Sequence, residues 1–74
     1  MLTREEISTG LDKNENGSMV EIKNFLITRY ITKINKNCFE VDDTSNGWVS
    51  AKVDKKTLVS LLMGKKSWIN LDWK

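Results

Sequence analysis

The chain has 74 residues, with 12 basic and 10 acidic side chains and a formal net charge of +2, so we expect one domain that spans residues 1–74. Its only cysteine is Cys38, and it has no histidine. This composition excludes an intrachain disulfide, argues against a zinc site and against histidine acid–base catalysis, and is typical of a cytoplasmic protein that carries no cofactor.

Residues 3–11 predict a short helix. Thr3 stands three residues before Glu6, which is the spacing of a capping box. Gly10 is expected to end this helix or to loosen its end. Two helical turns are not stable alone, so the helix should pack on the rest of the chain.

Residues 12–18 match the first half of a calcium-binding loop, with acidic and amide side chains at the required spacing before Gly17. The twelfth position of such a loop must supply an acid that binds the ion with two oxygens. Lys23 occupies this position, and Glu21 is displaced from it by two residues. A polar turn with Gly17 at positive φ is therefore favoured over calcium binding.

The middle of the chain predicts a β-meander, because runs rich in β-branched and aromatic residues alternate with turn residues. Asn35-Lys36-Asn37 is expected to form a three-residue hairpin loop with Asn37 in the left-handed region, and Asn46-Gly47 marks a further turn. Residues 19–34 could instead form one long bent strand. The four predicted strand runs are 19–23, 25–34, 38–42 and 48–53.

Alternation along these runs predicts which side chains face the core. The long run 25–34 carries apolar and polar side chains on both faces, which favours a bend. Asp42 and Asp43 are expected on opposite faces, so they would not share a proton, and Cys38 is expected to face outward. The predicted inward side chains are Val20, Ile22, Phe39, Val41, Val49, Ala51 and Val53.

Residues 54–64 predict a second helix, capped by Asp54 and ended by Gly64, with an apolar stripe of leucines. The last residues, 67–74, alternate again and predict a closing strand. In this strand Ile69, Leu71 and Trp73 are expected to face inward and Trp68 outward. The other register, which is less favoured, would instead turn Trp68, Asn70 and Asp72 inward.

This order of elements predicts an α+β fold with a short N-terminal helix and a helix before the last strand. In outline it resembles a small SH3-like or OB-like barrel that is partly open. The resemblance concerns the order of the elements alone.

The sequence favours a non-catalytic module, because it offers no histidine and no nucleophile paired with a base. Small size, near-neutral charge and surplus aromatic residues favour binding to another protein, as an inhibitor or adaptor of the kind that phages and mobile elements encode. No apolar run approaches the roughly 20 residues that cross a bilayer, and no secretory signal is apparent, so we expect no membrane association. The candidate partner-binding residues are Arg29, Tyr30, Lys33, Trp48, Lys52 and Trp68.

The alternative function is nucleic-acid binding, in which exposed rings stack on bases and lysines attract phosphates. Lys55 and Lys56, in the first turn of the second predicted helix, are the candidates for an anion site. The ten acidic side chains would weaken binding to phosphates. The tryptophans could also simply complete a thin core, and an uncovered strand edge could support a homo-oligomer.

Overall fold

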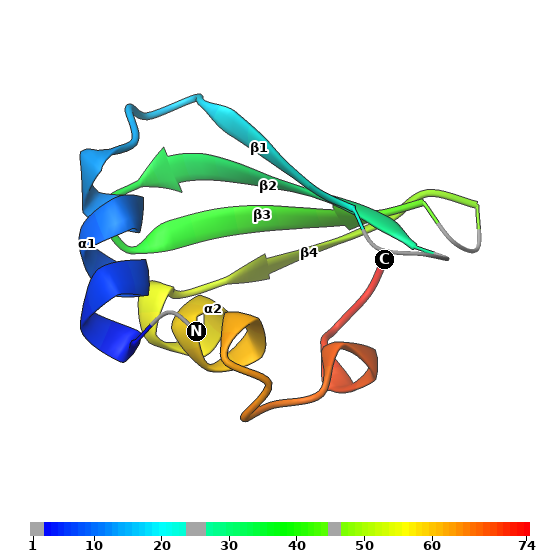
Figure 1. The fold of residues 1–74 in the computed structure, drawn as a ribbon. Helices are drawn as coiled ribbons and strands as arrows, with labels where there is room; N and C mark the ends of the chain where they lie inside the picture. The colour runs from blue at the N-terminus through cyan, green and yellow to red at the C-terminus, as the bar shows by residue number, and fades with distance from the viewer. Residues whose placement is uncertain (1–2, 24–26, 45–46) are drawn as a thin grey trace.

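The computed structural model describes residues 3–23, 27–44 and 47–74 (Figure 1). A four-stranded antiparallel sheet with the strand order β1-β2-β3-β4 is covered on one face by two helices and a short 3-10 helix. The elements are α1 (Arg4–Lys13), β1 (Met19–Lys23), β2 (Thr28–Asn35), β3 (Cys38–Asp43), β4 (Val49–Val53), α2 (Lys55–Leu62) and η1 (Trp68–Asn70).

The meander is confirmed, and the strand register explains the core. Ile31 on β2 lies opposite Val20 on β1 and Val41 on β3, and Val41 lies opposite Ala51 on β4, so these side chains share the face that the helices cover. Val41 is fully buried and belongs to a cluster that also contains apolar residues of both helices. The buried cluster consists of Leu11, Ile31, Phe39, Val41, Val53, Leu58, Val59 and Leu61.

The first helix begins as predicted but ends later. The Thr3 hydroxyl accepts a hydrogen bond from the backbone N–H of Glu6, and the Glu6 carboxylate accepts one from the N–H of Thr3, which completes the capping box. The prediction that Gly10 ends the helix is wrong, because α1 continues to Lys13. Leu11, the residue after Gly10, is buried in the core.

The turns of the sheet differ in part from prediction. Gly17 has a φ of +86°, as expected for the polar turn before β1. β1 and β2 pair as separate antiparallel strands, so the single bent strand over 19–34 is wrong, and the part of the run 25–34 that falls on 25–26 lies outside the described residues. Asn37 is not left-handed: among the described non-glycine residues, only Trp48 has a positive φ. The Asn37 N–H instead donates to the Asn35 side-chain oxygen at 2.9 Å.

The second helix is confirmed with both of its ends. The Asp54 carboxylate accepts a hydrogen bond of 2.7 Å from the Thr57 N–H. At the other end, Gly64 has a φ of +74°, and the N–H groups of Gly64 and Lys65 donate to the carbonyls of Leu61 and Ser60. These two bonds form a Schellman motif, which stops the helix.

The C-terminal segment does not form the predicted closing strand. Trp68–Asn70 is a 3-10 helix, whose period of three places Trp68 and Leu71 on one side, so both pack against the core while Ile69 is 82% exposed. The predicted orientation of Trp68 and Ile69 is therefore wrong, whereas the inward placement of Leu71 and Trp73 is confirmed. Only Lys74 pairs with the sheet, through two backbone hydrogen bonds to Ser50 on β4.

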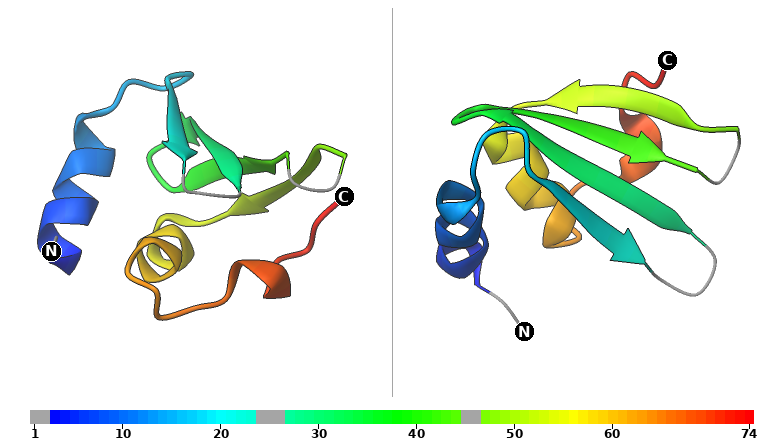
Figure 2. Two further views of the ribbon diagram at one scale, coloured as in Figure 1. Left: turned by 45° about the vertical axis from the view of Figure 1, so that its right-hand side comes forward. Right: turned by 90° about the horizontal axis from the view of Figure 1, so that it is seen from above.

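The sheet stays open among the described residues, because β1 and β4 are its two edges. Figure 2 shows that the helices lie along one side of the sheet and leave its other face uncovered. The α+β class is confirmed, and the SH3-like or OB-like barrel is not. Within residues 3–23, 27–44 and 47–74, no helix has the length and apolar character that crossing a bilayer requires.

Candidate functional site

Tyr30 and Trp48 meet on the uncovered face of the sheet. Their rings are stacked, with centroids 5.6 Å apart and planes inclined by 16°. Trp48 follows Gly47, and both have a positive φ, which turns the Trp48 ring back across the sheet. Trp48 is 59% exposed and Tyr30 is half-buried, so this pair presents aromatic surface to solvent.

Arg29 and Trp68 lie on the opposite, helix-covered face. The Arg29 guanidinium is 4.5 Å from the centroid of the Trp68 ring, and its Nε donates to the Asp43 carboxylate at 3.0 Å. The Arg29 side chain is only 13% exposed and that of Asp43 only 9%. These predicted binding residues therefore hold η1 against the sheet and are not part of the Tyr30–Trp48 surface.

Lys33, predicted as a surface cation, is 6% exposed. Its ammonium group donates to the carbonyls of Leu11 at 2.9 Å and Asn14 at 2.8 Å, and lies 3.4 Å from that of Asp12. The carbonyl oxygens at the end of α1 thus surround an internal cation. The backbone ligand of a calcium loop that begins at Asp12 would be the carbonyl of Ser18, and this carbonyl accepts a hydrogen bond from the Lys33 N–H at 3.0 Å.

The remaining predicted cations are dispersed. Lys52 is exposed on the uncovered face of β4. The Lys55 ammonium contacts the Asp12 carboxylate at 2.5 Å, and this hydrogen bond lowers the pKa of Asp12. Lys56 is exposed at the start of α2. Asp12 thus neutralises Lys55, and Asp54 takes up a free N–H of the first turn, so the anion site at Lys55 and Lys56 stays a prediction.

The adjacent carboxylates of Asp42 and Asp43 do not form a pair that shares a proton. Asp42 and Asp43 point to opposite faces, as predicted: Asp42 accepts a hydrogen bond of 2.6 Å from the Ser50 hydroxyl, whereas Asp43 binds Arg29. In the described part of the chain, no group of three or more histidine, cysteine, aspartate or glutamate side chains is placed to hold a metal ion.

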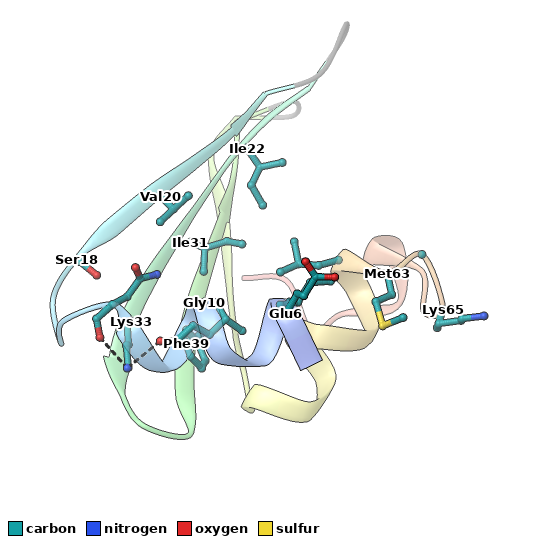
Figure 3. A pocket seen from close by; sticks show the side chains of 15 residues that line it. Glu6, Gly10, Ser18, Val20, Ile22, Ile31, Lys33, Phe39, Met63 and Lys65 are labelled. Atoms are coloured by element: carbon teal, nitrogen blue, oxygen red, sulfur yellow. Dashed lines mark hydrogen bonds between the residues drawn. The ribbon is translucent and has the colours of Figure 1, made fainter. Parts of the chain in front are cut away.

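A cleft that the sequence did not predict lies on the helix-covered side of the sheet. It lies between α1 and the strands β1 and β2, and the end of α2 closes one side (Figure 3). Its volume of about 970 Å³ falls at the upper end of the range typical of ligand sites. We call it the α1–β1 cleft.

Apolar side chains form the strand wall of the α1–β1 cleft. Val20 and Ile22 on β1 and Ile31 on β2 project toward α1 and the end of α2 (Figure 3). Val20 is 44% exposed although it lies on the core face of the sheet. The core face of β1 is therefore covered incompletely, and apolar surface remains accessible there.

The helix wall of the α1–β1 cleft leaves room. Ile7 and Gly10 on α1 face the cleft, and Met63 closes it beyond α2. A β-carbon added to Gly10 would meet no heavy atom within 4 Å. The charged residues Glu6 and Lys65 lie at the border of the cleft (Figure 3). A glycine weakens a helix interior, so Gly10 is a sequence signal that could have pointed to this site, although it was interpreted from the sequence only as a helix end.

Among the described strands, β1 pairs with β2 alone, so the edge of the sheet beside the cleft has no neighbouring strand there. The Lys33 N–H donates to the Ser18 carbonyl at 3.0 Å, so the backbone of Ser18 points toward β2. Because this direction alternates along a strand, Val20 and Ile22 also direct their backbone groups to β2, and the intervening residues direct theirs away from it. The outward backbone groups of β1 are those of Met19, Glu21 and Lys23.

Comparisons of the chain with protein-family models, with curated proteins and with solved structures found no significant match.

Proposed function

We propose that the protein is a non-catalytic module that binds another protein through the α1–β1 cleft. The observation that carries this proposal is the cleft itself, an apolar concave surface of about 970 Å³ beside the β1 edge of the sheet. Accessible apolar surface in a concave site gains free energy when a partner removes it from water, at about 25 cal/mol per Å² buried.

An inhibitor or adaptor role suits a protein of this size. A segment of a larger partner can bind in the one cleft, and this binding would block or recruit the partner. Cys38 is a free thiol, which fits a reducing compartment such as the cytoplasm, and we place the partner there. The Tyr30–Trp48 surface lies on the opposite face of the sheet and is not needed for this mode of binding.

Filling the cleft from α1 tests the proposal. Gly10→Phe places a ring in the cleft and also raises helix propensity, so the variant should remain folded while binding is lost. Thr9→Phe adds the same ring at a neighbouring exposed position outside the cleft and serves as the matched control. Wild type, Gly10→Phe and Thr9→Phe are each used for affinity capture from cell extract. We expect partners that bind wild type and Thr9→Phe and do not bind Gly10→Phe. Partners that all three proteins retain equally would argue against the cleft.

A second candidate function, nucleic-acid binding, is favoured by one observation, the exposed stack of Trp48 on Tyr30. Lys23 and Lys52 stand on the same face, but so do Glu21, Glu40 and Asp42, which repel phosphates. Titration of random single-stranded oligonucleotides, followed by tryptophan fluorescence, decides between the two functions. Quenching with a steep dependence on salt would support nucleic-acid binding, and no quenching at low salt would exclude it.

A further inference from the structure

We infer that the α1–β1 cleft takes its partner as an extended segment, which adds a fifth strand to the sheet along β1. The inference rests on the proposed function and specifies its mode. The outward N–H and C=O groups of Met19, Glu21 and Lys23 lie directly beside the cleft, and no strand of the described part of the chain pairs with them. An added strand would satisfy these groups with backbone hydrogen bonds, which require no particular side chain of the partner.

The pleat of the sheet then decides where the side chains of the added strand go. Successive side chains of a strand alternate between the two faces, and directly opposite residues of neighbouring strands share a face. A partner residue opposite Val20 or Ile22 therefore points to the helix-covered side, into the cleft. Every second residue of the segment should be apolar.

The helix wall offers the space that such side chains need. Gly10 leaves the middle of this wall without a side chain, and Ile7 and Met63 provide apolar contacts around it. A helical ligand could also fill an apolar cleft, but it would leave the backbone groups of β1 without a partner. The open edge is thus the feature that favours a strand over a helix.

Charge on the uncovered face specifies the intervening residues of the segment. Glu21 and Lys23 are exposed and project away from the helices. Opposite charges in directly facing positions stabilise a pair of strands, and like charges destabilise it. A basic residue is therefore favoured opposite Glu21 and an acidic one opposite Lys23, so that the segment alternates apolar and charged residues.

The same charges disfavour a second copy of this chain as the occupant. A symmetric antiparallel pairing that uses the whole of Met19–Lys23 is centred on Glu21. It would place Glu21 opposite the Glu21 of the other copy, which are like charges in a directly facing position. A partner with a complementary sequence avoids this repulsion.

Selection from a display library of random ten-residue peptides tests the mode, with wild type, Gly10→Phe and Thr9→Phe as targets. We expect peptides that bind wild type and Thr9→Phe and bind Gly10→Phe at least tenfold more weakly. Their apolar residues should recur at every second position. Recurrence at every third or fourth position, as in a helix, would overturn the strand mode and leave the proposed function intact. Peptides that bind all three targets equally, or none that bind, would overturn both.

Amide hydrogen exchange supplies the second readout. A selected peptide should slow exchange of the Met19, Glu21 and Lys23 amides at least tenfold, with smaller changes at Val20 and Ile22, whose amides already face β2. Unchanged exchange at the three outward amides in a saturated complex would overturn the strand mode. These amides could also exchange slowly in the free protein and exchange faster after dilution. This result would show that a second copy occupies the edge, and it would overturn the inference as well.

Discussion

The ammonium nitrogen of Lys33, on β2, lies 2.9 Å from the carbonyl oxygen of Leu11 near the end of α1. The same group donates to Asn14, one residue beyond the helix. Carbonyls in the last turn of a helix have no partner within the helix and carry the negative end of its dipole. A buried cation at this position joins α1 to the sheet, and it thereby holds the helix wall of the α1–β1 cleft.

Replacing Lys33 by methionine should destabilise the protein by about 2–3 kcal/mol, since it keeps the apolar stem and removes hydrogen bonds from a charged group to buried carbonyls. Urea unfolding measures the change. Lys36→Met, at an exposed position in the same hairpin, is the control and should change stability by less than about 0.5 kcal/mol. Equal effects of the two substitutions would contradict the role given to Lys33. Amide exchange in α1 should also become faster in Lys33→Met alone.

Replacing Arg29 by methionine should loosen η1. The substitution removes the ion pair with Asp43 and the contact with the Trp68 ring, and we expect a loss of about 2–3 kcal/mol. Tryptophan emission should shift to longer wavelength as Trp68 becomes more exposed. Arg4→Met is the matched control, because Arg4 is exposed and its guanidinium forms a long hydrogen bond of 3.4 Å to the Ser60 hydroxyl. An unshifted emission spectrum in Arg29→Met would contradict this arrangement.

The cap of α2 should make stability depend on pH. Hydrogen bonding from Thr57 lowers the pKa of Asp54 below its ordinary value. A carboxyl group with a lowered folded-state pKa contributes stability that is complete above its unfolded pKa of about 3.9 and is lost as the pH falls through the folded value. Asp54→Asn keeps a capping oxygen but cannot titrate, and Asp54→Ala should cost about 1 kcal/mol at neutral pH.

Urea unfolding of wild type and Asp54→Asn between pH 7 and about pH 2.5 measures this contribution, because other titrating groups are common to both proteins and cancel in the difference. Asp12, whose pKa is also lowered, by the hydrogen bond from Lys55, is one of these common groups. Any advantage of wild type over Asp54→Asn should shrink as the pH falls. A difference that stays constant over the whole range would contradict the assignment.

Local patterns predicted the helix starts and the meander because their causes lie within a few residues. Thr3 caps α1 through Glu6, three positions away, and Asp54 caps α2 through Thr57 in the same way. The C-terminal segment was wrongly predicted as a strand, because its apolar residues also alternate with a period of two. The observed 3-10 helix instead places Trp68 and Leu71 on one side, and no residue within the segment favours one period over the other.

The candidate site was predictable only in part, since it depends on contacts between distant segments. The alternation along β2 placed Lys33 on the same face as Ile31. The carbonyl oxygens that stabilise the buried ammonium group come from the end of α1, which β1 separates from β2 in the chain. The α1–β1 cleft likewise arises from the placement of α1 relative to β1. Tyr30 and Trp48 were predicted as exposed rings, yet their stacking depends on the positive φ of Trp48, which its sequence does not favour.

Substitutions of Trp48 should separate backbone strain from ring stacking. A non-glycine residue in the left-handed region costs about 1–2 kcal/mol, whereas the stack on Tyr30 contributes about 0.5–1.5 kcal/mol. Trp48→Asn tolerates the left-handed backbone and loses the stack, so its stability should stay within about 1 kcal/mol of wild type. Trp48→Val also loses the stack and adds a β-branched side chain at the positive φ, so it should be clearly less stable than Trp48→Asn in urea. Equal stabilities would mean that the backbone at Trp48 is not constrained.

Trp48→Asn should retain every partner that depends on the α1–β1 cleft, because Trp48 lies on the other face of the sheet. A loss of those partners would move the binding surface to the Tyr30–Trp48 pair.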